Sequence, residues 1–379
     1  MTTNLLDLDS KEMEAYFSGL GEKPFRAKQM MRWVHKQRQM DFSKMTNISL
    51  HCRELLSESA TVKVPIFSHP AKDLDGTLKW LLVTDKHNAV ETVFIPERKR
   101  GTLCVSSQVG CALDCSFCAT GKQGFNRNLS TGEIIGQLWN ASRYLESQHE
   151  LSREGEFALN GGRGITNIVM MGMGEPLANY KNVVRALRIM IDNDGYGYSR
   201  RKVTVSTSGI IPNMEKLMND CPVSLAVSLH AADDDLRDKL VPINQKYPLR
   251  LLLEACRRYV YRIQDNGMAE DKLSQRDFIT FEYVMLKGIN DSIVHAKLVG
   301  NLLQNIPCKI NLIPFNNFEN SNYESSQRDN IYRFRDILKN QGYVCTIRRT
   351  RGVNTQSACG QLAGEVYDKT KRTLNSSLN

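Results

Sequence analysis

Three cysteines in one short loop are the residues of this chain best suited to chemistry. Cys111, Cys115 and Cys118 follow a C-x3-C-x2-C spacing. An iron–sulfur cube normally takes one thiolate on each iron, so three thiolates leave one iron open to another ligand. The spacing therefore favours a 4Fe–4S cluster with an open coordination position.

A zinc site completed by a distant histidine or cysteine is the alternative for the same loop. Structural zinc sites usually combine two C-x2-C pairs, and this chain has no second pair with that spacing. The cluster is the favoured interpretation on spacing alone, and zinc stays open.

Polar residues follow several predicted strands downstream of the cysteine loop. Glycines allow the backbone to approach a ligand, and a carboxylate can bind an amino group. The residues concerned are Gly174, Glu175, Ser206, Ser208, Ser228, Leu229, His230 and Asn316. Each is a weak signal alone, but ligands bind at the carboxyl ends of the strands in barrel-like folds. Together they predict one cofactor cleft.

Two further cysteines could take part in the chemistry. Cys104 lies on a predicted strand just before the cluster loop, and Cys359 lies between Gly352 and Gly360 in a polar segment. A thiolate at Cys359 could act as a nucleophile or methyl acceptor, and Cys104 could trap it as a disulfide. The alternative, which is commoner for lone cysteines, is that both are ordinary small residues. That interpretation is kept for Cys52, Cys221, Cys256, Cys308 and Cys345.

The order of predicted elements indicates an α/β fold with a partial (β/α)6 barrel, a small helical N-terminal domain and a short β extension. The first 60 residues read as helical, with Pro24 at a helix start and a basic face of Arg26, Lys28, Arg32, Lys36 and Arg38. A hairpin turn is expected at 85–88, and a capping box at Ser130 opens a helix to about Glu146. A surface insertion is expected from Ser147 to Asn167.

Strands and helices alternate after that insertion, which implies a parallel sheet with right-handed crossovers. The strands after the insertion are expected at 168–171, 203–206, 223–228, 278–285, 309–313 and 343–347, with helices at 181–193, 249–263, 293–306 and 326–340 between them. The expected parts are a helical accessory domain at 1–60, a β-hairpin extension at 61–100, the barrel at 101–350, and a C-terminal loop and tail at 351–379.

Composition restricts the compartment and the partner. The chain has 379 residues, 41% of them hydrophobic, which is enough to fill a sizeable core. Its start does not resemble a signal peptide, and no stretch is long and apolar enough to span a membrane. Ten cysteines without a secretory signal indicate a reducing compartment, so we expect a cytoplasmic protein, and a monomer by default. A net charge of +9 suits a polyanionic partner such as nucleic acid.

Four motifs taken together resemble bacterial adenine-C2 methyltransferases of the RlmN family, within the radical S-adenosylmethionine (SAM) superfamily. They are the segments Leu103–Cys111, Gly124–Leu129, Gly172–Leu177 and Ala358–Leu362. The similarity runs through nearly the whole chain. Members of that family methylate an adenosine in 23S rRNA and one in a subset of tRNAs.

The resemblance implies a role for each candidate residue. Cys111, Cys115 and Cys118 would hold the 4Fe–4S cluster, and Cys359 would be methylated, with Cys104 as its disulfide partner. Glu91 would be the proton acceptor, although from sequence alone it is an ordinary strand glutamate. The positions that would bind SAM are Gly174, Glu175, Ser206, Ser228, Leu229, His230 and Asn316.

The same resemblance implies a mechanism and its partners. Two SAM molecules are used per turnover: one methylates Cys359, and the second supplies a radical that activates this methyl group. Besides 23S rRNA and tRNA, an external flavodoxin-type electron donor and a disulfide reductant would be needed. The chain departs from the family pattern just before Cys359, where Asn354-Thr355 replaces the usual Asp-Ile pair.

Two other functions compete with this one. A related enzyme methylates carbon 8 of the same ribosomal adenine and shares the cysteines, but the flanking motifs fit the carbon-2 family better. A zinc-stabilised RNA-binding protein without catalysis would give residues such as Glu175, Ser206 and His230 no reason to cluster.

Overall fold

The computed structural model describes residues 2–98, 100–151, 164–265, 279–319 and 321–370. Helices dominate the N-terminal region: α1 (Ser10–Gly19), α2 (Phe25–Met31), which continues into a π-helical turn at Arg32–Lys36, and α3 (Leu50–Ser59). Asp9 caps α1 in a capping box, and Pro24 precedes α2, so the predicted helix start is confirmed. Short strands β1 (Thr3–Asn4) and β2 (Ala60–Thr61) pair and bring the two ends of this region together.

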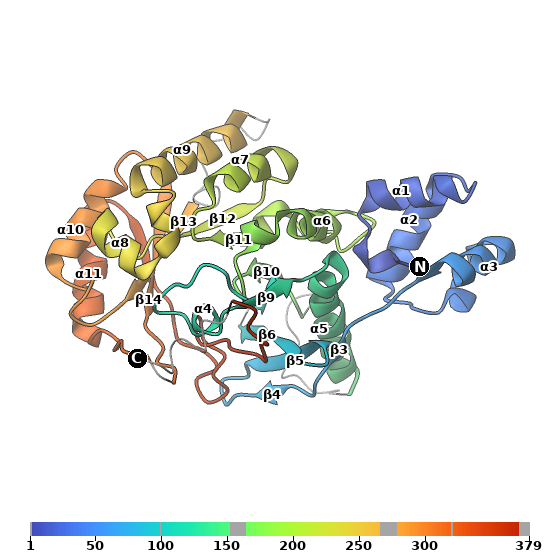
Figure 1. Ribbon diagram of the computed structural model, residues 1–379, viewed down its shortest axis with the longest axis horizontal. Coiled ribbons are helices and arrows are strands. Elements are labelled where there is room, and N and C mark those ends of the chain that lie inside the picture. The colour runs from blue at the N-terminus through green and yellow to red at the C-terminus, as the bar shows by residue number, and fades with distance from the viewer. Residues whose placement is uncertain (1, 99, 152–163, 266–278, 320, 371–379) are drawn as a thin grey trace.

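The N-terminal helices lie beside the rest of the molecule (Figure 1) and are joined to it by ion pairs and hydrogen bonds. Three cations of the predicted basic face form ion pairs with carboxylates of the same chain. Arg26 pairs with Glu22, Arg32 with Asp194 and Arg38 with Glu146. Lys28 and Lys36 are exposed. The predicted basic face is therefore partly paired with carboxylates of the same chain, although the Arg32 side chain stays 58% exposed.

One large sheet organises the remainder, with strand order β15-β14-β13-β12-β11-β10-β7-β6-β5-β3, and β4 pairs with β5 off this path. The extension is antiparallel: β3 (Ile66–Phe67), β4 (Ala71–Lys72), β5 (Leu78–Asp85) and β6 (Asn88–Glu97). The parallel strands are β7 (Arg100–Cys104), β10 (Asn167–Met170), β11 (Val203–Thr207), β12 (Ser224–Ser228), β13 (Ile279–Met285), β14 (Cys308–Pro314) and β15 (Val344–Ile347). The predicted strands of the parallel sheet are confirmed, with ends shifted by a residue or two.

Helices cover the outer face of this sheet, as Figure 1 shows for α6, α7, α9, α10 and α11. Their bounds are α5 (Thr131–Leu151), α6 (Tyr180–Ile191), α7 (Ile211–Asp220), α8 (Asp234–Leu240), α9 (Leu249–Asp265), α10 (Ile293–Leu302) and α11 (Arg328–Asn340). In α6, for example, Val183, Leu187 and Met190 are buried at helical spacing. Burial of such faces against the sheet holds the strands in a curved, open barrel. No helix in the described part of the chain is long and apolar enough to cross a membrane.

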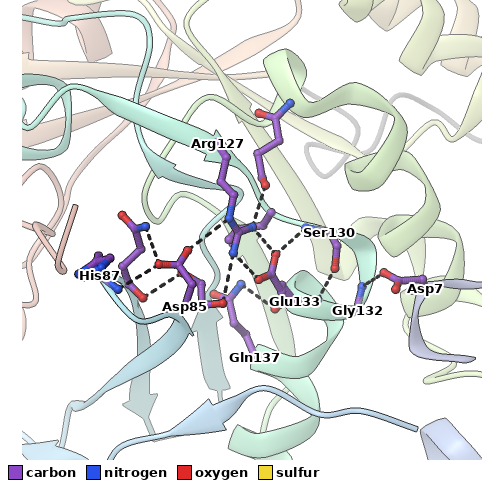
Figure 2. A network of polar contacts seen from close by, with 12 residues as sticks. Asp7, Asp85, His87, Arg127, Ser130, Gly132, Glu133 and Gln137 are labelled. Atoms are coloured by element: carbon purple, nitrogen blue, oxygen red, sulfur yellow. Dashed lines mark hydrogen bonds and ion pairs between the residues drawn. The ribbon is translucent and has the colours of Figure 1, made fainter. Parts of the chain in front are cut away.

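A polar network fixes the start of α5 beside the hairpin (Figure 2). Ser130 and Glu133 exchange hydrogen bonds, which confirms the predicted capping box. Arg127 makes two hydrogen bonds of 2.8 Å to the Glu133 carboxylate and pairs with Asp85 in the β5–β6 turn. Asp7 accepts a hydrogen bond from the Gly132 amide. Three regions of the chain are therefore held to one helix terminus.

The expected surface insertion from Ser147 to Asn167 is wrong at both ends. Helix α5 continues to Leu151 instead of ending near Glu146, and Asn167 is the first residue of β10. The middle, 152–163, lies outside the described residues. Continued helical hydrogen bonding outweighs the charge-rich composition on which the predicted boundary rested.

Candidate active site

The cysteine loop connects two short antiparallel strands, β8 (Gln108–Gly110) and β9 (Phe125–Asn128). The Cys111 amide donates to the Gly124 carbonyl at 2.7 Å, which closes the neck of the loop. Gly110 has a φ of +75°, and a Cβ there would lie 2.1 Å from the Gly124 oxygen, so only glycine fits. Helix α4 (Ala119–Lys122) then leads back to β9.

The three thiols of the loop lie near one another. Burial raises the pKa of Cys115 well above its ordinary value, and the neighbouring Cys111 and Cys118 add to that rise. In a cube each thiolate binds a different iron, so the three thiols of this loop can serve three irons and leave the fourth open.

A cavity of about 150 Å³ lies next to this loop at the carboxyl ends of the strands. Its lining includes six of the seven predicted cofactor residues: Gly174, Glu175, Ser206, Ser228, His230 and Asn316. Phe117 and Cys118 from the cluster loop and Cys359 complete the wall. The parallel sheet thus brings together residues that are far apart in the sequence, because the carboxyl ends of its strands share one edge.

Glu175 is buried in this wall and aims its carboxylate at backbone amides. One oxygen accepts from Leu177 N at 3.1 Å and the other from Ser208 N at 2.9 Å. Burial raises the pKa of Glu175, although these hydrogen bonds oppose the rise. A cationic amino group would stabilise the buried carboxylate further, which suits the amino acid end of SAM.

His230 adopts a left-handed backbone conformation, with a φ of +62°, and is buried. Burial, helped by the nearby Arg237 cation, lowers the pKa of His230 to about 3, so the ring is neutral. Its Nδ1 accepts the Val284 amide at 3.1 Å. We assign the proton to Nε2 on that basis, which leaves one donor for a ligand. The Phe117 ring packs edge-on against His230, with centroids 4.6 Å apart.

Leu229 does not line the cavity; its side chain is fully buried in the core. The backbone groups of Leu229 take part in hydrogen bonds that fix the end of β12. The Leu229 amide donates to the Glu282 carbonyl at 3.0 Å, and its carbonyl accepts from Arg237 at 3.0 Å.

Arg237 is a residue that sequence reasoning missed. Its side chain is fully buried and donates to the carbonyls of Ser208, Ser228 and Leu229 and to the Asn244 side chain, at 2.7–3.0 Å. Burial lowers the pKa of Arg237 to about 10, so it remains a cation. Its hydrogen bonds connect the carboxyl ends of β11 and β12. The sequence of α8, which is short and acidic, does not distinguish Arg237 from a surface arginine.

A second, larger cavity of about 580 Å³ fills the open barrel. Cys104 and Cys359 both line it, and Cys359 lines the smaller cavity as well. Both thiols are free. Cys359 therefore lies between the two cavities, which is the relationship expected of a group carrier.

The charge around these thiols comes from Arg348 and Glu282, which pair at 3.5 Å. The thiolate of Cys359 favours the Arg348 cation and raises its pKa. Burial raises the pKa of Cys359, and Arg348 opposes that rise. Burial likewise raises the pKa of Cys104 to about 12. Arg348 is thus the cation able to stabilise a thiolate at Cys359.

Hydrogen bonds fix the backbone around Cys359. The Asn316 side chain donates to the Cys359 carbonyl at 3.1 Å, and Ala119, just after the cluster loop, donates to the Gly360 carbonyl at 2.8 Å. Thr120 donates from its hydroxyl to the Leu362 carbonyl. The cysteine loop and the Cys359 loop are therefore held directly against each other.

Glu91 lies on β6 and is not among the residues that line either cavity. It is buried, pairs with Lys79 at 2.8 Å and accepts the Ala363 amide at 3.1 Å. Val93, two residues along the same strand, lines the larger cavity, so Glu91 belongs to the same face of the sheet. Reaching a substrate there would require Glu91 to exchange one of these partners.

Comparisons with known proteins identify the family of this chain. A family model described as the ribosomal RNA large subunit methyltransferase N-terminal domain matches residues 3–62, and the radical SAM superfamily model matches residues 105–296. A crystal structure of a radical SAM methyltransferase from Sphaerobacter thermophilus is 39% identical, covers 95% of this chain and 99% of its own, and superposes with a TM-score of 0.82. SuiB from Streptococcus suis, bound to S-adenosylmethionine, is 12% identical over 65% of this chain and 50% of its own, with a TM-score of 0.42, too weak a likeness to bear on function.

The fold and the cysteine loop thus define a radical SAM enzyme, a class whose chemistry implies a 4Fe–4S cluster and SAM. The chain belongs to the RlmN family of radical SAM rRNA methyltransferases.

Proposed function

We propose that this enzyme methylates carbon 2 of an adenosine in 23S rRNA and in a subset of tRNAs. The observation that carries the proposal is the position of Cys359, a residue that lines both the small cavity beside the cysteine loop and the large cavity that Cys104 also lines. A methyl group placed on that sulfur in one cavity is available to a base in the other. Carbon 2 of adenine is electron-poor, so a carrier that delivers a radical suits it better than direct displacement.

The cofactor positions follow from the donors present. Cys111, Cys115 and Cys118 would hold the cluster, and Glu175, His230 and the strand ends that Arg237 fixes would hold SAM. When bound and reduced, the cluster supplies the electron that cleaves SAM to a 5′-deoxyadenosyl radical.

Cys359 performs the transfer in this scheme. As a thiolate beside Arg348, it takes a methyl group by displacement from a first SAM. It then gives one hydrogen atom of that methyl group to the 5′-deoxyadenosyl radical. The resulting methylene radical forms a bond to carbon 2 of adenine, and the adduct returns the one electron that SAM cleavage consumed. The Cys104 thiolate finally attacks the sulfur of Cys359. The bond between this sulfur and the methylene carbon breaks, the carbon takes up a proton to become the methyl group of the product, and a disulfide is left for an external reductant.

The proton on carbon 2 must leave before the product is released. We assign this step to Glu91, which already accepts hydrogen bonds and lies on the cavity face of β6. Lys79, paired with this carboxylate at 2.8 Å, holds it in place on β6.

The large cavity suits a nucleotide on a phosphate chain. Five cations line it: Arg100, Lys309, Arg348, Arg349 and Arg351. A base must leave its stack to enter, at a cost of a few kcal/mol. The helical region at 1–60 would add RNA affinity as an accessory domain, through a surface that includes Lys28 and Lys36 rather than the whole predicted basic face.

The test begins with anaerobic purification, iron and sulfide analysis and a visible spectrum. About four irons per chain and a brown colour that dithionite bleaches are expected. Purified rRNA and tRNA are then incubated with SAM and a flavodoxin-type reductant and digested for mass spectrometry. We expect 2-methyladenosine. 8-Methyladenosine would show the carbon-8 activity instead, and bound zinc with no colour after reconstitution would contradict the radical mechanism.

A further inference from the structure

The tight turn between β4 and β5 contacts the segment that carries Cys359. We propose that Asp73, in this turn, is a positioning residue that holds the Cys359 loop across the mouth of the open barrel. The proposal deepens the proposed function and rests on it for the meaning of Cys359. Asp73 touches no cavity-lining thiol itself, so it acts through the loop.

The contacts converge on one carboxylate. Asp73 Oδ2 accepts the backbone amides of Asn354 at 2.8 Å and Thr355 at 3.1 Å, and the Thr355 hydroxyl at 3.4 Å. The Asn354 side-chain amide donates to the other oxygen at 3.3 Å. Burial acts to raise the pKa of Asp73, but the amides of Thr355, Asp75 and Asn354 outweigh it and leave the pKa below its ordinary value. Asp73 is therefore a charged acceptor for four donors of one short segment.

Further hydrogen bonds connect the residues that Asp73 binds to the residues just before Cys359. Asp75 accepts the Gly352 amide at 3.1 Å, and the Thr355 and Ser357 hydroxyls share a 2.6 Å hydrogen bond. Ser357 also donates its amide to the Gly352 carbonyl at 2.9 Å and lines the large cavity beside Cys359. Fixing Thr355 thus fixes the turn from which Cys359 follows.

The contact also bridges the two ends of the open sheet. Asn354 follows β15, the last strand at one edge, whereas Asp73 lies between β4 and β5 near the other edge. The residues joined are 281 positions apart in the chain. The other contacts between β15 and Cys359 lie at Thr350, Arg351 and Gly352, so Asp73 is what holds Asn354 and Thr355 in particular.

The local sequence departure fits the same interpretation. The family pattern usually has Asp-Ile where this chain has Asn354-Thr355, so an aspartate at position 354 would face the Asp73 carboxylate. Here Asn354 and Thr355 are neutral and supply side-chain donors to it. Asp73 and the Asn354-Thr355 pair therefore match each other, and the departure does not loosen the Cys359 loop.

The experiment measures the thiols of the full chain purified anaerobically, without RNA or SAM. Diamide oxidises Cys104 and Cys359 to a disulfide, taking up two electrons and two protons, and peptide mass spectrometry follows its rate. Iodoacetamide alkylation of Cys359 is followed in parallel. Asp73→Ala should slow disulfide formation about tenfold and speed alkylation of Cys359 several-fold, because the loop leaves Cys104. Leu74→Ala is the matched control, since Leu74 is 96% exposed in the same turn, and it should behave as wild type.

A charge exchange separates positioning from general damage to the fold. Asn354→Asp should slow disulfide formation about as much as Asp73→Ala does, because two carboxylates then face each other. Adding Asp73→Asn to Asn354→Asp should restore the rate to within about threefold of wild type. Equal rates for Asp73→Ala and Leu74→Ala, or no rescue in the double variant, would overturn the proposal.

These thiol rates also distinguish a failure of the role proposed for Asp73 from a failure of the proposed function. If the thiols respond as expected but wild type makes no methyladenosine, Asp73 positions the loop and the proposed function is wrong. If wild type makes 2-methyladenosine and the thiols do not respond, the proposed function stands and the role of Asp73 is wrong.

Discussion

Replacing the buried Arg237 with methionine should weaken both the fold and SAM binding. Methionine keeps much of the apolar stem but removes the donors to the carbonyls of Ser208 and Ser228 and to Asn244. Leu229 keeps one partner, the Ala231 amide. Each of these three buried acceptors left without a donor costs about 1–3 kcal/mol, so we expect a total loss of about 3–9 kcal/mol. For a chain of 379 residues, that loss lowers the Tm by roughly 4–11 °C.

The assay is circular dichroism melting under reducing, anaerobic conditions, with Arg258→Met as the control. Arg258 pairs with Glu215 on the surface, and such exposed pairs contribute about 0–1 kcal/mol. In the reconstituted enzyme, Arg237→Met should also raise the KM for SAM about tenfold, because the ends of β11 and β12 lose their common anchor. A decrease in Tm no larger than that of Arg258→Met would refute the reasoning.

Three further predictions concern a buried histidine and the proposed reaction. Burial lowers the pKa of His35 to about 3. Below pH 6.5 the unfolded chain therefore binds a proton at this histidine that the folded chain does not bind, and the free energy of unfolding decreases as the pH falls. His35→Leu should reduce the decrease between pH 7.5 and 5 by about 2 kcal/mol, measured by urea titration at each pH. Cys104→Ala should trap a covalent protein–RNA adduct visible on denaturing gels, and free product at the normal rate would exclude its resolving role. Glu91→Gln should leave methylation of Cys359 intact while slowing product release at least about 100-fold in single-turnover assays, and an unchanged release rate would move the proton acceptor elsewhere.

Local sequence patterns were sufficient to predict features that depend only on residues close together in the chain. The C-x3-C-x2-C loop, the capping box at Ser130 and the hairpin at 85–88 depend on neighbouring residues. The gathering of Ser206, His230 and the other strand-end residues was also predictable, because parallel strands place their carboxyl ends at one edge.

Features set by distant packing were not predictable in the same way. Nothing in the sequence indicates that Arg237 is buried or that the Leu229 side chain points into the core. The contact of Asp73 with Asn354 depends on two sheet edges meeting. The basic face of the N-terminal helices is partly paired with acids such as Asp194 and Glu146, which belong to other parts of the chain.

The way the last described residues lie across the barrel has a consequence for biosynthesis. The segment from Gly352 to Lys369 contacts the β4–β5 turn, the cluster loop, β6 and β9, all of which are translated far earlier. Contacts between such distant segments form late in folding, because their loop-closure entropy must be overcome first. While the chain is still being translated, the three cluster cysteines remain uncovered by this segment. Because this segment reaches the cluster loop last, we expect co-expression with cluster-assembly machinery to load the enzyme better than reconstitution after purification.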